Sequence, residues 1–526
     1  MNSKIILTNL TVLKKKYGAA GLKKINTAIT ALIAADKKRG FQTSLLALDS
    51  AAAMKKVKGK KVTDPQDPEQ NKAAIDAIYT AHVPDYLLLL GAIDVIPHQD
   101  LFNPVFSPGS DDDEYAHGDL PYACAAPYSQ QVKDFLGPTR IVGRLPDLTG
   151  GTDPAYLLGL LATAAGWASR PPADYTADFA ISAEVWKKST ALSVQKLFGA
   201  SGTVQLVPPG GPGWSAALLG KRAHFINCHG SPADPQFYGQ KGSAFPVAHR
   251  AALIPGKIAE GTVASVECCY GAELYDPGLA GGQAGLANTY LSEKAWGYFG
   301  SSTIAYGPAI GNGAADLICQ YFLRRVMAGA SLGRATLEAR LEFAGGAAEL
   351  DPVDLKTLAQ FNLLGDPSIH PVARPAAPAV AVAPKAGGAA KGFAGALADA
   401  AVARTDRRRQ LFSRGLRIGA TQACAIKLAK AKLSGPLLAA LKKMAAQMDV
   451  PAPEILSFKI QSPALPKGAF SHAMKAGPMA QMAAPDGFHV VTGARSFTGI
   501  DVPQVVAMVA KEVAGKIVSY REMQSR

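Results

Sequence analysis

Two short apolar segments of the chain each end in side chains that could do covalent chemistry. Residues 223–230 end in His229-Gly230, and residues 263–271 carry Cys268-Cys269, with Cys269 forty positions after His229. A thiolate is a strong nucleophile, but a thiol needs a neighbouring base and electropositive surroundings to ionise near neutral pH. If the two segments are neighbouring parallel strands, their carboxyl ends meet at one edge of the sheet. The pair then predicts a thiol with a histidine base beside it.

The glycines of these segments indicate where a reacting carbonyl group would sit. A backbone N–H group without a side chain over it can approach a substrate carbonyl closely. We therefore expect the N–H groups of Gly230 and Cys269 to form an oxyanion hole. The same region could instead hold zinc through Cys228, His229 and the two adjacent cysteines. Adjacent cysteines are poor chelators and the chain has no Cys-x-x-Cys spacing, so no metal is predicted here.

Size and composition limit the class of protein. A chain of 526 residues exceeds the size of a single core, so several domains are expected, and 48% hydrophobic residues supply their interiors. Six irregularly spaced cysteines do not suit a disulfide framework, which favours a reducing compartment. Residues 1–18 do not resemble a secretion signal, and no apolar run approaches the length of a membrane span. The sequence therefore predicts a cytoplasmic protein without a membrane span.

The net charge of +14 belongs to the C-terminal part of the chain. Residues 374–526 hold 22 Lys+Arg against 8 Asp+Glu, whereas the preceding residues are balanced. A basic segment can bind nucleic acid or an anionic membrane through phosphate groups, or it can dock an acidic protein or the body of the same protein. Its few aromatic residues do not alternate with the arginines, which disfavours base stacking. We favour docking of a regulatory protein partner over nucleic acid.

The predicted elements give an α/β protein in four parts. Strands and helices alternate up to about residue 372, and the strands are continuous apolar runs, as in mostly parallel sheets covered on both faces. Residues 1–171 form an N-terminal α/β subdomain and residues 172–372 a second one. Residues 373–395 are a Pro/Ala/Gly-rich linker. Residues 396–526 are a small basic α+β module, with expected helices over 405–448 and 502–513 and strands over 455–460 and 488–491.

Together these motifs resemble the caspase-like cysteine proteases. In that group an apolar block ending in His-Gly precedes an apolar block ending in Cys. Residues 267–271, Glu-Cys-Cys-Tyr-Gly, are similar to the Gln-Ala-Cys-x-Gly of caspases and the Asp-Ser-Cys of metacaspases. The comparison implies that Cys269 is the nucleophile and Cys268 a packing residue.

A more extensive resemblance, from about residue 86 to 369, is to the gingipains, peptidase family C25. It includes the strand-and-turn of residues 86–97, the strand at 141–144, both blocks described above, the helix start at 329–335 and Leu-Gly-Asp-Pro-Ser at 364–368. The family implies two α/β subdomains, the second caspase-like, and an acid that orients the histidine. The position that matches this acid is Glu184, whose carboxylate would hold the His229 ring. A solvated glutamate at a strand end is the alternative.

The sequence departs from the family at the pocket for the residue before the cut. Gingipains that cut after arginine use an aspartate on the segment following that glutamate, but residues 185–190 contain no acid. The other pocket loop, residues 301–314, has none either. A buried basic side chain without a carboxylate is costly, so cleavage after basic residues is not expected unless an acid reaches the pocket from elsewhere. Trp186, Lys187 and Tyr306 are weak candidates for the pocket lining.

No cofactor is required by this chemistry. The acidic run at residues 111–114 could hold a structural calcium ion through its carboxylates, or could be a solvated loop.

The resemblance and the residues together predict a cysteine-type endopeptidase that acts on proteins or peptides through an acyl-enzyme. Cys269 is the expected nucleophile, His229 the base and Glu184 the orienting acid, and the C-terminal module or a partner is expected to regulate them. The alternative is a catalytically silent scaffold or binding protein that keeps the fold, because a fold does not guarantee its chemistry. A nucleic-acid-binding protein driven by the basic module is a third reading.

Overall fold

The protein is described here by a computed structural model, which places residues 2–346, 350–373, 428–448, 450, 452–460, 486–495 and 504–526. The predicted linker over 373–395 lies outside these residues, apart from its first position, as does the Arg-rich run at 407–409.

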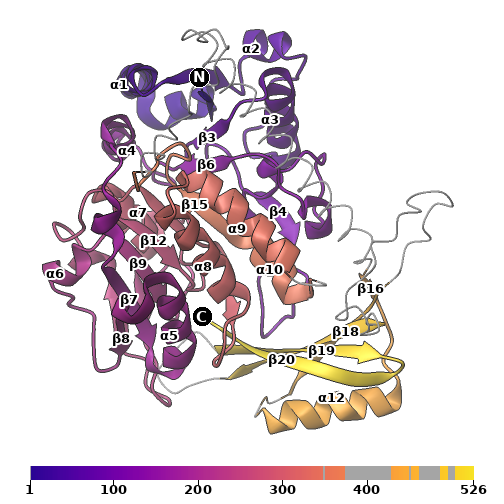
Figure 1. The fold of residues 1–526 in the computed structure, drawn as a ribbon. Coiled ribbons are helices and arrows are strands. Elements are labelled where there is room, and N and C mark those ends of the chain that lie inside the picture. Colours follow the sequence, from indigo (N-terminus) through magenta and orange to yellow (C-terminus); the bar gives the residue numbers. More distant parts are fainter. Residues whose placement is uncertain are drawn as a thin grey trace, which may run out of the picture.

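A ten-stranded sheet forms the centre of the molecule, in the order β2-β1-β3-β6-β15-β13-β12-β9-β7-β8 (Figure 1). All neighbouring strands are parallel except β13 and β15. Its strands are β1 Asn2–Thr8, β2 Phe41–Ala47, β3 Tyr86–Leu90, β6 Val142–Leu145, β7 Asp178–Ala183, β8 Val204–Val207, β9 Ala223–Asn227, β12 Val263–Val266, β13 Gly297–Ser301 and β15 Phe361–Leu364. The predicted α/β class with a mostly parallel sheet is confirmed.

Helices cover both faces of this sheet, because successive side chains of each strand point to opposite faces. In β13, Tyr298 belongs to one apolar cluster and Phe299 to another. The first cluster packs α1, α4 and α7, and the second packs α8, α9 and α10. The larger helices are α1 Leu10–Lys38, α3 Pro68–His82, α4 Ala155–Gly166, α5 Lys187–Phe198, α7 Leu286–Ser292, α8 Ala314–Met327, α9 Leu332–Gly346 and α10 Pro352–Gln360. Both faces are therefore buried, as the continuous apolar strands require.

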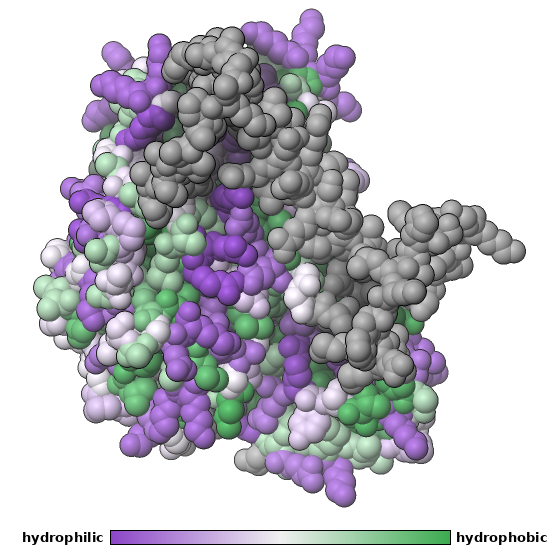
Figure 2. All heavy atoms as spheres, viewed as in Figure 1, coloured by the Kyte–Doolittle hydropathy of each residue, from purple (hydrophilic) through white to green (hydrophobic). Residues whose placement is uncertain are grey.

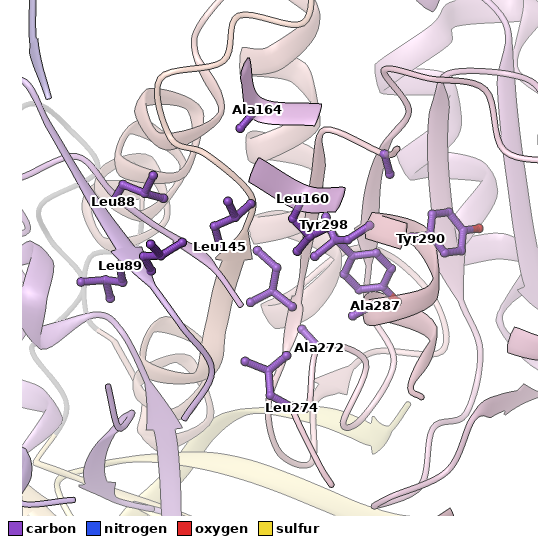
Figure 3. Packing of buried hydrophobic residues seen from close by; sticks show 14 of the residues in the cluster. Leu88, Leu89, Leu145, Leu160, Ala164, Ala272, Leu274, Ala287, Tyr290 and Tyr298 are labelled. Carbon is purple, nitrogen blue, oxygen red and sulfur yellow. The ribbon is translucent and has the colours of Figure 1, made fainter. Parts of the chain in front are cut away.

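The two predicted α/β halves share this sheet and its core. Residues 1–171 supply β2, β1, β3 and β6, residues 172–372 supply the rest, and the halves join where β6 lies beside β15. Figure 3 shows the shared core, where Leu88, Leu89 and Leu145 of the first half lie in the same cluster as Tyr290 and Tyr298 of the second. The site at the edge of the sheet consequently rests on one continuous framework.

The C-terminal residues form a second, antiparallel sheet in the order β14-β20-β19-β18-β17-β16. Its elements are β14 Tyr306–Gly307, β16 Leu428–Lys430, α12 Gly435–Gln447, β17 Glu454–Ile460, β18 Gly487–Arg495, β19 Gln504–Val513 and β20 Lys516–Ser525. One face packs on the body through residues such as Val105, Tyr306 and Val353, and α12 covers the other face. The expected α+β module is present, and its sheet includes β14, which comes from the second α/β half of the chain.

The expected helix over residues 502–513 is wrong, because residues 504–513 form strand β19. This strand lies between β18 and β20, and its first seven residues are buried. A run of valine, alanine and methionine fits such a strand as well as a buried helix, and the β-branched residues favour the strand. Of the expected helix over residues 405–448, the described part contains β16 and α12.

Hydrophilic side chains are interspersed with apolar ones over the face of the molecule drawn in Figure 2. Across the ranges given above, no helix is both long and apolar enough to cross a membrane. The five cysteines within those ranges are free thiols, and all are buried.

Candidate active site

The strand register brings the two predicted reactive residues to the same edge of the sheet. Strands β9 and β12 are parallel neighbours, and Ile226 is paired with Val266. His229 and Cys269 each follow three residues after this pair, so they leave the sheet at the same height of its carboxyl edge. Both line one cavity of about 470 Å³.

Cys269 is held as a covered thiol. Its side chain is only 3% exposed. The N–H of Ala305 donates to its Sγ at 3.2 Å. Burial raises the pKa of the Cys269 thiol to about 12. Its neighbour Cys268 is fully buried in the apolar core, which agrees with a packing role for that cysteine.

His229 is fixed both through its backbone and through its ring. Its backbone N–H and C=O exchange hydrogen bonds of 2.8 Å with Tyr238. The ring contacts the rings of Trp186 and Phe245, with centroid distances of 4.3 and 5.0 Å. Nε2 lies 2.8 Å from Oε1 of Gln240, and an amide oxygen only accepts, so Nε2 carries the proton and Nδ1 keeps the lone pair. Burial lowers the pKa of His229 to about 4, so the ring is a neutral base.

The expected contact between Glu184 and His229 is not formed. β7 ends at Ala183, and Glu184 begins a short 3-10 turn that leads into α5. This turn directs the carboxylate to Lys187 three residues later, at 2.5 Å. The hydrogen bond from Lys187 lowers the pKa of the partly exposed Glu184. The ring partner of His229 is Gln240 instead, which the sequence did not single out.

The two backbone N–H groups expected in the oxyanion hole point to one oxygen. The N–H of Gly230 donates to the carbonyl oxygen of Arg526 at 3.2 Å, and the N–H of Cys269 donates to the same oxygen at 2.9 Å. A Cβ atom at position 230 would meet the Cys269 carbonyl oxygen at 1.8 Å, so only glycine fits there. A carbonyl group of the chain itself thus occupies the place expected for a substrate carbonyl.

The residues before Arg526 lie in the cleft as an extended strand. β20 pairs antiparallel with β14, with Ser525 opposite Tyr306 and Gln524 opposite Gly307. The N–H of Arg526 donates to the carbonyl of Ala305 at 3.0 Å. Figure 1 shows the C-terminal end of β20 reaching the body beside α5 and α8. This is how an extended peptide adds to an exposed strand edge.

The Arg526 side chain is fully buried in a pocket next to Cys269. Its Nη2 donates to the Pro308 carbonyl at 2.9 Å and lies 3.2 and 3.3 Å from the two carboxylate oxygens of Asp316. The guanidinium carbon lies 4.4 Å from the centroid of the Trp186 ring. The two pocket loops considered in the sequence contain no acid, and the possibility of an acid from elsewhere was left open; Asp316 is an acid of that kind. Asp316 comes from the first turn of α8, two positions beyond the loop in which an acid was sought.

A second buried carboxyl group, Glu267, lies next to this ion pair. Both its oxygens are buried, and within the described ranges neither has a hydrogen-bond partner. Burial, and then the charge of Asp316, raise the pKa of Glu267 well above its usual range, while Arg526 lowers it. The pocket therefore sets two buried carboxyl groups, those of Asp316 and Glu267, close to one guanidinium.

The remaining predicted residues lie close by with other partners. Trp186 lines the arginine pocket, whereas Lys187 is exposed on the first turn of α5. The Tyr306 hydroxyl donates to Asp111 at 2.7 Å. Asp111 and its neighbour Asp113 converge on the buried ammonium of Lys356, at 2.6 and 3.2 Å, which commits two carboxylates of the acidic run. Within the residues that the structure places, no group of three or more His, Cys, Asp or Glu is suited to a metal ion.

Comparison with known proteins gives similarity at the level of solved structures. A scan against protein-family models and a search of curated proteins both find no match. The chain is similar to a solved structure described as "Structure of Protease", at 16% identity and a TM-score of 0.47, over 70% of this chain and 78% of that chain. It is also similar to the complex of Porphyromonas gingivalis RgpB pro- and mature domains, at 12% identity and a TM-score of 0.44, over 70% of this chain and 79% of that chain. With the Saccharomyces cerevisiae separase–securin complex it shares 12% identity and a TM-score of 0.27, over 44% of this chain and 14% of that chain.

Proposed function

We propose that the protein is a cysteine-type endopeptidase whose reactive pair is Cys269 and His229. The observation that carries this proposal is the double hydrogen bond from Gly230 and Cys269 to one carbonyl oxygen, made beside a thiol and an imidazole in the same cavity. Two convergent N–H donors at hydrogen-bond distance from one oxygen are what a tetrahedral oxyanion requires. A merely structural thiol and histidine would not need them.

The geometry supports a two-step reaction. A substrate strand would pair with β14 as β20 does, with its carbonyl oxygen between the two N–H donors. Sγ of Cys269 attacks the carbonyl carbon while Nδ1 of His229 takes the thiol proton. The proton then passes to the leaving amine, the C–N bond breaks and a thioester remains. Water, deprotonated by His229, attacks the thioester and releases the acid and the thiol. Gln240 keeps the ring in the required tautomer through Nε2.

We further propose that the C-terminal module keeps this site latent. β20 uses the same main-chain groups of β14, Gly230 and Cys269 that a substrate would use. The module also reaches the histidine's partner, because Nε2 of Gln504 lies 3.4 Å from Oε1 of Gln240. In this arrangement the thiol and the imidazole are both uncharged. A protein partner that displaces the C-terminal sheet would act as an activator.

A thiol-directed peptide probe tests the proposed chemistry. We expect a peptidyl chloromethyl ketone to alkylate the full-length Arg526→Ala protein at Cys269. The label should disappear in Cys269→Ala, persist in Cys268→Ala as the matched control, and fall at least about a hundredfold in His229→Ala, since general-base assistance is commonly worth 10²–10⁴. Labelling that is the same in all of these variants would contradict the proposal.

A catalytically silent binding protein is the second candidate. It is favoured by the burial of Cys269 and by an amide, rather than a carboxylate, on Nε2 of His229. This candidate predicts that Arg526→Ala exposes Cys269 to iodoacetamide but leaves it inert to the peptide probe and to peptide substrates. The probe experiment therefore separates the two candidates.

A further inference from the structure

We infer that the outer edge of β20, together with the groove between this strand and α12, is a docking surface for an extended, acidic segment of a protein partner. The inference rests on the proposed function and deepens it, because it names where a partner would bind the C-terminal sheet and what chemistry that partner would present.

The two edges of β20 are paired to very different extents. On its inner side β19 pairs with residues 516–524, whereas on its outer side β14 pairs only with Gln524 and Ser525. Among the residues that the structure places, no strand lies beside residues 516–523 on the outer side. In an antiparallel pair, alternate N–H and C=O groups point away from the neighbouring strand. This stretch therefore presents main-chain donors and acceptors to which an extended peptide can add.

A groove of about 870 Å³ lies between this edge and α12, which runs alongside β20 in Figure 1. Its apolar lining comes from both elements and includes Leu437, Met444, Ile517, Val518 and Tyr520. Val518 and Tyr520 are 53% and 57% exposed, although the first seven residues of the neighbouring β19 are buried. Large apolar side chains gathered in an exposed groove mark an interaction site. A strand added to β20 would cover them with the side chains that it turns toward α12.

Charge determines which partner the groove suits. Lys443 is exposed and lines the groove, and Arg495 lines an adjoining hollow of about 370 Å³. Among the residues of the described ranges that line the two, Glu522 is the only acid. An acidic strand would therefore complement this surface.

The chain itself does not supply that acidic strand. Residues 374–526 hold 22 Lys+Arg against 8 Asp+Glu, so a second copy docked by the same surface would bring like charges together. Residues 374–427 of the same chain are also too basic, with ten Lys+Arg against two Asp+Glu. The occupant that fits is consequently a segment of another protein.

A strand bound to this edge would lie in line with β14. β14 pairs with Gln524 and Ser525 immediately before Arg526 enters the cleft. A partner segment that runs past Met523 would compete with β14 for the main-chain groups of these two residues. Docking on the outer edge is therefore linked to release of the cleft.

Peptide binding to the full-length Cys269→Ala protein tests the docking surface without requiring chemistry. The probe is a fluorescein-labelled peptide of alternating glutamate and valine, ten residues long like β20. It is compared with an alternating lysine–valine peptide and with a glutamate–valine peptide whose central valines are replaced by proline. We expect the acidic peptide to bind at least about tenfold more tightly than either, since lysines are repelled and proline removes main-chain donors. Equal affinity for the acidic peptide and either comparison peptide would overturn the inference.

Two neighbouring lysines of α12 provide a matched pair of variants. Lys442 and Lys443 are both exposed, but only Lys443 lines the groove. At physiological salt, Lys443→Glu should weaken the acidic peptide about threefold to tenfold, and Lys442→Glu less than about twofold. Tyr520→Ser removes apolar contact area and should weaken it at least about threefold. Equal effects of the two lysine variants, with no effect of Tyr520→Ser, would contradict the placement of the docking surface.

Two other occupants of the surface are distinguished with the same proteins. A short DNA duplex that binds more tightly than the acidic peptide and displaces it would assign the surface to nucleic acid. A full-length chain that sediments as a dimer, but as a monomer after Tyr520→Ser, would assign the surface to a second copy. Either result would overturn the inference.

Alkylation of Cys269 by iodoacetamide separates failure of the inference from failure of the proposed function. In the full-length chain with Cys269 intact, saturating acidic peptide should speed alkylation, and Lys443→Glu should require more peptide for the same effect. Binding without faster alkylation would refute the link to the cleft and leave the docking surface standing. Faster alkylation by iodoacetamide, without labelling by a peptidyl chloromethyl ketone, would refute the endopeptidase and leave the inference standing.

Discussion

Replacing Arg526 by alanine should convert a latent protein into an active one. In the occluded state the side chain contributes an ion pair to Asp316, a hydrogen bond to Pro308 and a stacking contact with Trp186, all of them buried. The substitution leaves the Asp316 carboxylate buried without its cation whenever β20 stays in the cleft. Removing one partner of a buried pair costs about 3–5 kcal/mol. Since 1.4 kcal/mol corresponds to a factor of ten, the ratio of occluded to open molecules should fall by about 10²–10⁴.

The assay is the initial rate on a fluorogenic peptide with arginine before the cut, measured on the full chain and on the Arg526→Ala variant. The gain in rate ends when the open state dominates, so the rate of Cys269 alkylation by iodoacetamide is followed in parallel as a direct measure of exposure. Lys516→Ala is the matched control, because this basic residue lies on the same strand and is exposed at its far end. Rates that do not differ among the three proteins in either measurement would refute self-occlusion by β20.

Three other expectations concern charge and pH. Burial lowers the pKa of His224 to about 4 and that of His249 to about 3. Unfolding therefore takes up protons, and the free energy of unfolding should decrease as the pH falls below 6.5. At pH 5 the expected decrease is about 2 kcal/mol for each imidazole, measured by urea unfolding. Gln240→Glu should raise the pKa of His229 and so move the acid limb of the pH–rate profile, measured in the Arg526→Ala background, to higher pH. An acid limb at the same pH would contradict the role given to the contact between Gln240 and His229. Lys356→Met leaves two buried or nearly buried aspartates without their cation and should lower the free energy of unfolding by about 3–5 kcal/mol, so a stability equal to that of the parent would be inconsistent with this ion-pair network.

The parts of the fold that the sequence predicted are those in which local pattern and burial agree. The expected strand and turn over residues 86–97 contain strand β3, and the strands before His229 and Cys269 end close to the expected positions. These apolar runs are too short to form helices, and turn residues bound them, so they are predicted as buried strands. The prediction for β19 was wrong for the opposite reason, since this segment of ten residues, seven of them apolar, is long enough for either structure. Its pairing partners, β18 and β20, decide the outcome, and those contacts are not local.

The candidate site also contains residues that the sequence predicted and residues that it did not. Cys269 and His229, the proposed nucleophile and base, and the two N–H donors directly follow strands whose ends are visible in the sequence. Gln240 is a neutral residue that reaches the ring only because the chain returns past Tyr238, so no spacing signals it. Asp316 sits at the third position of a helix, where its hydrogen bond to the Gly313 N–H gives it an ordinary capping role. The arginine that it binds is 210 positions away, and only the assembled fold brings the two together.

The pairing of β20 with β14, a strand that comes from the second α/β half of the chain, has a consequence for how the protein responds to its surroundings. A segment tethered to the molecule that it blocks competes at an effective concentration on the order of millimolar, whatever the amount of protein. A free peptide at ordinary cellular abundance cannot win that contest. Abundant substrate alone would therefore not activate the protein. Activation would require a mechanical force or a binding partner that separates β20 from β14. If β20 occludes the cleft as proposed, access to the cleft depends on what binds the C-terminal sheet.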